Sequence, residues 1–145
     1  MKNGLVMLLA LALCATTALA HQGVKNPAVM ARMHGMKQIS DNVKMLGTMA
    51  KGQIAFDAAT AQNAARAIAR HSAESVALFT APETDPKSEA REVIWTEFDD
   101  FSAKARDLET LANDLANTLN SLDDVKAAMK PLGASCKACH SVYRD

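Results

Sequence analysis

Cys136-Lys137-Ala138-Cys139-His140 lies close to the end of the chain and has the pattern C-x-x-C-H. This pattern is a signature of covalent haem attachment, in which each cysteine sulfur forms a thioether with one vinyl group of a c-type haem. On a helix, positions i and i+3 lie on one face, so both sulfurs can reach the same haem. His140 follows Cys136 by four positions, and its imidazole can bind the iron. The motif predicts one covalent haem c per chain, held by Cys136 and Cys139, with His140 as the proximal ligand.

Two other kinds of site use a C-x-x-C pair. A structural zinc site needs four ligands. The rest of the chain offers only Cys14 and three scattered histidines, His21, His34 and His71. A thioredoxin-like dithiol needs a βαβ context, and the sequence has no strand pattern. Haem attachment is therefore the favoured interpretation, and a haem-free structural or metal-binding helical bundle is the alternative of another class.

The N-terminus has the features of a secretory signal peptide. Lys2 gives a positive start, Leu5 to Ala15 is an apolar run, and Ala18-Leu19-Ala20 is an A-x-A cleavage site. The apolar run is too short to span a bilayer comfortably. We therefore expect residues 1–20 to be removed, Cys14 with them, and residues 21–145 to reach the periplasm without a membrane anchor.

Composition is typical of one helical domain. The chain has 16 Lys and Arg against 16 Asp and Glu, without a basic patch, so nucleic acid is not an expected partner. Aromatic residues make up 4% of the chain, too few for a β-sandwich or barrel. No Ser-His-Asp, paired-carboxylate or Gly-rich phosphate signature is present, so we do not expect an enzyme. Asp99-Asp100 and Asp123-Asp124 are interpreted as solvated or capping charges.

Two helices are predicted in the first half of the mature chain. The first opens at Asn26-Pro27, an N-cap followed by proline at the first helical position, and stops at Gly52. Met36, Ile39, Val43, Leu46 and Ala50 step along one face of it. The second is capped by Asp57 and runs to about Phe79, with small residues on its inner face. Residues 80–88 contain two prolines and form the clear loop.

Two further helices follow the loop. The third starts between Ser88 and Trp95 and ends near Leu119, with a regular apolar spacing. The fourth is capped by Ser121, and Pro131 is expected to kink it or to split off a first segment. Because most connections are short, we predict an all-α fold, an antiparallel up-down-up-down four-helix bundle that encloses the covalent haem.

The chain resembles the cytochrome c-prime family over essentially all of residues 21–145. The residues that carry the resemblance are Gly133 to His140, Tyr143-Arg144, Lys51-Gly52-Gln53 and Ile94-Trp95. The resemblance implies one of two iron sites. Cytochromes c-prime proper are five-coordinate and high-spin and bind nitric oxide or carbon monoxide, whereas their low-spin relatives add a methionine from the first helix and carry electrons.

Met36 resembles the residue at the distal position of the family, counted back from Lys51-Gly52. A methionine on a core-facing stripe is often only packing, but we favour Met36 as the distal ligand and hence an electron carrier, with a gas-binding high-spin protein as the alternative. Arg32, one turn before Met36, and Arg144 are candidates for contacts to haem propionates. We also expect periplasmic redox partners, with Lys137 in a docking rim, and the resemblance implies a possible homodimer through the first two helices.

Overall fold

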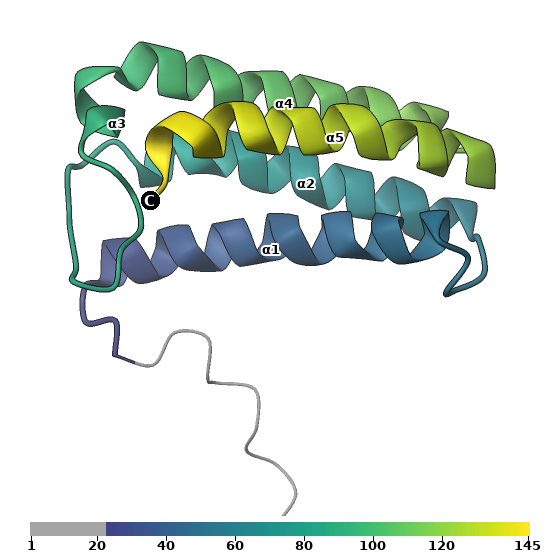
Figure 1. Cartoon of the computed structure of the whole chain (residues 1–145), viewed down its shortest axis with the longest axis horizontal. Coiled ribbons are helices and arrows are strands. Elements are labelled where there is room, and N and C mark those ends of the chain that lie inside the picture. Colours follow the sequence, from purple (N-terminus) through teal and green to yellow (C-terminus); the bar gives the residue numbers. More distant parts are fainter. Residues whose placement is uncertain (1–22) are drawn as a thin grey trace, which may run out of the picture.

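The computed structural model describes residues 23–145, and the predictions for residues 1–20, Cys14 and His21 lie outside them. The described part is helical: α1 is Pro27–Ala50, α2 Ala58–Leu78, α3 Val93–Thr96, α4 Phe98–Thr118 and α5 Leu122–Tyr143 (Figure 1). The four long helices run alternately up and down, and α3 is a single turn at one end. The predicted all-α four-helix bundle is confirmed.

The helix starts follow the local chemistry that the sequence indicated. The Asn26 side chain accepts hydrogen bonds from the backbone N–H groups of Ala28 and Val29, at 2.8 and 3.2 Å, which satisfies two free donors at the start of α1. Asp57 caps α2 in the same way. Gly52 has a φ of 67°, a left-handed conformation that costs glycine little and that ends the α1 segment.

One boundary differs from the prediction. The expected third helix is divided at Glu97, where φ is −121° and ψ is 38°, so that α3 and α4 are separate. A tertiary contact accompanies this break, because the indole of Trp95 in α3 donates to the backbone carbonyl of Phe79 at 2.8 Å. In α5, Pro131 lies inside the helix without splitting it.

One end of the bundle is filled with apolar side chains. Its fully buried members come from all four long helices or their ends: Leu46, Ile68, Leu119, Val125 and Leu132. Buried alanines on α2 let its neighbours approach closely, as the small inner face predicted. We call this part of the molecule the filled end.

At the other end, the segment of residues 80–92 between α2 and α3 crosses from the start of α1 to the end of α5 (Figure 1). We call this segment the strap. Its Asp85 accepts from the backbone N–H groups of Lys25 and Asn26, at 2.9 and 3.1 Å. Ala90 forms an isolated antiparallel bridge with Arg144, so the strap is fastened at both sides.

Candidate haem site

A cavity of about 720 Å³ lies at the strap end of the bundle. Its walls come from all five helices and the strap, and most of the lining surface is apolar. Protein pockets for small molecules and cofactors are commonly apolar and roughly 300–1,000 Å³ in volume. All six residues that the sequence pointed to line this one cavity: Arg32, Met36, Cys136, Cys139, His140 and Arg144.

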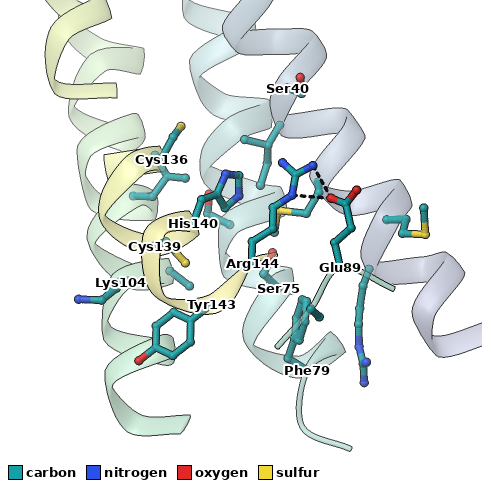
Figure 2. Close-up of a pocket in the computed structure, with 18 of the residues that line it drawn as sticks. Ser40, Ser75, Phe79, Glu89, Lys104, Cys136, Cys139, His140, Tyr143 and Arg144 are labelled. Carbon is teal, nitrogen blue, oxygen red and sulfur yellow. Dashed lines mark hydrogen bonds and ion pairs between the residues drawn. The ribbon is translucent and has the colours of Figure 1, made fainter. Parts of the chain in front are cut away.

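The C-x-x-C-H motif lies on the last turns of α5 (Figure 2). Cys136 and Cys139 are half-buried free thiols. Burial raises the pKa of both, and the positive charge of Lys104 partly opposes this for Cys139. His140 is exposed, yet partial burial lowers its pKa, and the charge of Arg144 acts in the same direction. The neutral imidazole, which is the form that binds metals, is thereby favoured.

Met36 lines the cavity from α1, the helix across the cavity from the motif. It is half-buried, and Met33, Ile39 and Val43 of the same helix line the cavity beside it. His34 is exposed and is not part of the lining. The structure therefore puts Met36 of α1 and the motif of α5 in the lining of the same cavity.

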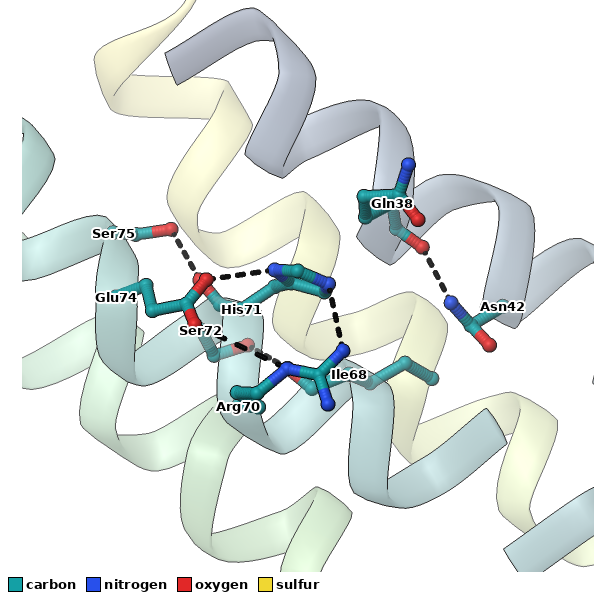
Figure 3. A network of polar contacts seen from close by, with 8 residues as sticks. All are labelled: Gln38, Asn42, Ile68, Arg70, His71, Ser72, Glu74 and Ser75. Atoms are coloured by element: carbon teal, nitrogen blue, oxygen red, sulfur yellow. Dashed lines mark hydrogen bonds and ion pairs between the residues drawn. The ribbon is translucent and has the colours of Figure 1, made fainter. Parts of the chain in front are cut away.

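The serines of the α2 wall do not offer hydrogen bonds to the cavity. Ser72 and Ser75 line it, but their hydroxyls donate to the backbone carbonyls of Ile68 and His71, both at 2.8 Å (Figure 3). His71 lies outside the lining, and its ring nitrogens contact Glu74 and Arg70. Since these polar groups are satisfied by the protein, this wall behaves as an apolar surface.

Arg32 is buried, with 3% of its surface exposed, and it is one of the residues that line the cavity. Three of its N–H groups donate to backbone carbonyls, those of Leu78 at 2.8 Å, Ala81 at 2.5 Å and Glu83 at 2.6 Å. Burial lowers its pKa and the Glu83 carboxylate opposes this, but an arginine stays charged in a protein. A contact to a propionate stays a prediction, with two N–H groups left to make it.

Arg144 stands at the edge of the cavity and is paired with Glu89 of the strap (Figure 2). Its Nε donates to Glu89 Oε2 at 2.6 Å, and a second guanidinium nitrogen contacts the same oxygen. Both side chains are about half exposed, so the pair adds little stability. Glu89 was not singled out in the sequence, because nothing local indicates its pairing.

Tyr143 fixes the end of α5 to α4. Its hydroxyl donates to Asp100 at 2.5 Å, and its ring packs edge-on against Phe101 with centroids 5.5 Å apart. Burial and the bond to Asp100 raise the pKa of Tyr143, and that same bond lowers the pKa of Asp100. Asp100 is therefore more than the solvated or capping charge that the sequence indicated.

The family described as Cytochrome C′ matches residues 27–144, which include the lining of the cavity and the motif. The chain belongs to the cytochrome c′ family. It is 39% identical over 110 residues to cytochrome c-556 of Agrobacterium fabrum, covering 75% of each chain. It is 32% identical over 148 residues to cytochrome c-554 of Cereibacter sphaeroides, covering 94% of each. The solved structure of cytochrome c′ from Rhodopseudomonas palustris superposes with a TM-score of 0.77 at 28% identity, over 83% of this chain and 98% of that one.

Cytochrome c′ proteins carry one covalent haem c per chain, and the residues here fit that group. Two thiols three positions apart and a following imidazole face an apolar cavity of suitable size. Within residues 23–145, no three His, Cys, Asp or Glu side chains are grouped so that they could hold a metal ion by themselves. Within the same range, no helix is long and apolar enough to cross a membrane.

Proposed function

We propose that this cytochrome c′ family member is a periplasmic electron carrier with a six-coordinate, low-spin haem. Cys136 and Cys139 hold the haem, His140 binds its iron on the proximal side, and Met36 binds on the distal side. The observation that carries the proposal is that one cavity is lined by the motif on α5 and by Met36 on α1. The bound haem supplies a one-electron couple, and a Met/His ligand pair favours a high reduction potential.

The protein's own contribution is to keep the iron's surroundings dry and fixed. Ile39 and Val43 flank Met36 with apolar surface, and the hydroxyls of the α2 wall are turned to their own backbone. A methionine held in such a wall would stay bound to the iron before and after electron transfer. Little then has to rearrange, which suits exchange of electrons with a partner.

A five-coordinate, high-spin protein that binds nitric oxide or carbon monoxide is the second candidate. Met33 lines the same wall as Met36, which favours a packing role for the methionines of this helix. The relatives do not decide between the two, since those described above are named cytochrome c-556, c-554 and c′.

Replacement of Met36 separates these candidates. We expect Met36→Ala to convert the reduced low-spin spectrum into a high-spin one that responds to carbon monoxide. Met33→Ala, on the same wall, is the matched control and should leave the spectrum low-spin. If both variants and the unmodified protein gave the same high-spin spectrum, Met36 would be packing and the gas-binding candidate would stand.

The periplasmic location is proposed from the sequence of residues 1–20. Export through a signal peptide predicts a mature protein that begins at His21, which N-terminal sequencing of protein from the periplasmic fraction checks. A mature protein that keeps Met1 to Ala20 would contradict it.

Lys137 is proposed to help dock an acidic redox partner. It is exposed on α5 directly after Cys136, so its charge lies beside the haem attachment site. We expect Lys137→Glu to slow electron exchange with an acidic partner at low salt. Lys51→Glu, an exposed lysine after the end of α1 at the filled end, serves as the control. Equal rates for both variants would remove Lys137 from the docking rim.

A homodimer through α1 and α2 also belongs to the proposal. Sedimentation of the haem-loaded protein over a range of concentrations tests it, because a dimer must dissociate on dilution.

A further inference from the structure

The buried Arg32 side chain contacts aromatic rings as well as backbone carbonyls. Its guanidinium lies over the ring of Phe79, 4.7 Å from the centroid, and 5.4 Å from that of Trp95. The ring faces and the three backbone carbonyls described above all belong to the end of α2, the strap and α3. One side chain of α1 is thus joined to three consecutive parts of the chain around the cavity.

The bonds of Arg32 are of the strong kind. Hydrogen bonds from a charged donor are roughly twice as strong as neutral ones, and a guanidinium places its donors in a rigid fork. Cations over aromatic faces add further attraction. The last carbonyls of a helix have no partners within the helix, and Arg32 supplies one to Leu78 at the end of α2.

The same turn of α1 also packs closely on α2. A Cβ atom added at Gly35 would lie 3.5 Å from Leu78 Cδ1, an ordinary van der Waals distance, so Leu78 at the end of α2 lies beside this turn of α1. Gly35 is buried and directly precedes Met36. The helix is therefore fixed to α2, both by polar bonds and by packing, within the turn that leads into Met36.

A second contact supports the attachment of Arg32 to the end of α2, and it comes from a residue outside the cavity lining. The Trp95 indole donates to the carbonyl of Phe79, which holds the two aromatic rings around Arg32. Trp95 does not line the cavity, whereas Arg32 does.

We infer that Arg32 is a positioning residue, which fixes the α1 turn preceding Met36 against the end of α2 and so sets where Met36 stands relative to the haem iron. This rests on the proposed function for its main readout, since a displaced Met36 shows itself most directly when it is an iron ligand. It assigns three N–H groups of Arg32 to the carbonyls of Leu78, Ala81 and Glu83 and leaves two N–H groups for the predicted propionate contact.

The test is carbon monoxide binding to reduced, haem-loaded protein for the unmodified chain and three variants. We expect Arg32→Met to raise the ratio of carbon monoxide-binding to inert haem by about tenfold or more, as loss of several charge-assisted bonds would shift a two-state equilibrium. Arg32→Lys should recover only part of the effect, because an ammonium cannot reproduce the fork. Trp95→Phe should give a smaller shift in the same direction.

Two comparisons separate positioning from other roles. A role in propionate binding alone predicts that Arg32→Lys behaves like the unmodified protein and that Trp95→Phe has no effect. Leu119→Ala, a buried change at the filled end, controls for general loss of stability and should leave the haem inert to carbon monoxide at temperatures where it stays folded. If Arg32→Met does not fold, Trp95→Phe and Arg32→Lys still carry the test.

Each pattern of results is decisive. An inert unmodified protein with carbon monoxide-binding Arg32 and Trp95 variants supports the inference. An inert unmodified protein whose Arg32 and Trp95 variants are equally inert overturns it and leaves Met36 ligation intact. If the unmodified protein already binds carbon monoxide, the proposed ligation fails; the positioning role then stands only if these variants change the association rate several-fold more than Leu119→Ala does.

Discussion

The filled end and the strap end of this bundle differ in how their interiors are built. Around Leu46, Leu119 and Val125 the interior is closed by apolar side chains that are fully buried. At the strap end the interior is a cavity of about 720 Å³, bordered by a smaller apolar cluster of Phe79, Ile94, Phe101 and Tyr143. Directional bonds at the margin of the cavity add to this cluster. These bonds include the hydrogen bonds from Arg32 to the end of α2 and the strap, and the hydrogen bond from Tyr143 to Asp100. They also include the contacts of Asp85 and Ala90, which attach the strap to the start of α1 and to the end of α5.

This difference shows how a simple bundle makes room for a large cofactor. Packing alone would close the space between four helices, because apolar surface drives them together. Directional bonds at the margin hold the helix ends at fixed places while the space between them stays open. The apolar core of the filled end stabilises the fold, and the bonds at the strap end fix the positions of the helix ends around the cavity.

Removal of the haem attachment should have the largest effect, and only on the strap end. We expect the double variant Cys136→Ala and Cys139→Ala to lose all haem that survives acid–acetone extraction, because no thioether can form. Absorbance of the extracted protein measures this. The same extraction of Ser135→Ala, a neighbouring cavity residue, should leave the chromophore in place. A covalent chromophore in the double variant would contradict the assignment of both cysteines.

A cavity made at the filled end should lower stability without changing the haem. We expect Leu46→Ala, at a fully buried site, to reduce the free energy of unfolding by about 2–5 kcal/mol. Denaturant unfolding measures the loss, and the optical spectrum of the folded variant should be unchanged. A spectral change as large as that of a strap-end variant would show that the two ends are not independent.

Two helix caps give a matched comparison of the ends. Ser121 caps α5 at the filled end through Asp124, and its replacement by alanine should cost about 1 kcal/mol. Asn26 caps α1 and also donates to Glu83 of the strap at 2.6 Å. Asn26→Ala should therefore cost more than Ser121→Ala and should also speed hydrogen exchange in the strap. Equal costs and an unchanged strap would mean that the bond to Glu83 contributes nothing.

The smallest effect expected is a pH dependence confined to the strap. Backbone N–H groups, first that of Lys87 and then those of Lys25 and Asn26, lower the pKa of Asp85 in the folded protein. The pKa of an aspartate carboxyl in the unfolded chain is about 3.9. Since the folded pKa is the lower one, Asp85 stabilises the strap above that pH, and the contribution is lost as the pH falls through the lowered pKa.

Hydrogen exchange of strap amides, corrected for intrinsic rates, should therefore rise in acid for the unmodified protein. Asp85→Asn should exchange faster at neutral pH and lose this acid-induced rise. Amides of α2 near Ile68 are the internal control. A rise of the same size in both regions would assign the pH dependence to the whole fold.

The sequence predicted those parts of the molecule that local chemistry determines. The caps Asn26 and Asp57, the stop at Gly52 and the spacing of the motif are all short-range signals, and the helices begin and end where these place them. The six candidate site residues were found from motif and resemblance, and the structure brings them to one cavity. Their roles at the iron and the propionates stay predictions.

What the sequence did not indicate depends on contacts between distant parts of the chain. The separation of α3 from α4 at Glu97 goes with a bond from Trp95 to Phe79, 16 positions away. The partners of Arg32 are 46 to 51 positions away, and Glu89 meets Arg144 across 55. No local sequence pattern encodes such pairs, so the contacts that attach the strap to α1 and α5 could only be seen in the folded protein.

The most direct test of the account is the optical spectrum of the purified, reduced protein without and with carbon monoxide. Ligation of the iron by His140 and Met36 predicts sharp low-spin α and β bands that carbon monoxide does not move. A broad high-spin spectrum that carbon monoxide converts would contradict the central claim and leave a gas-binding member of the family.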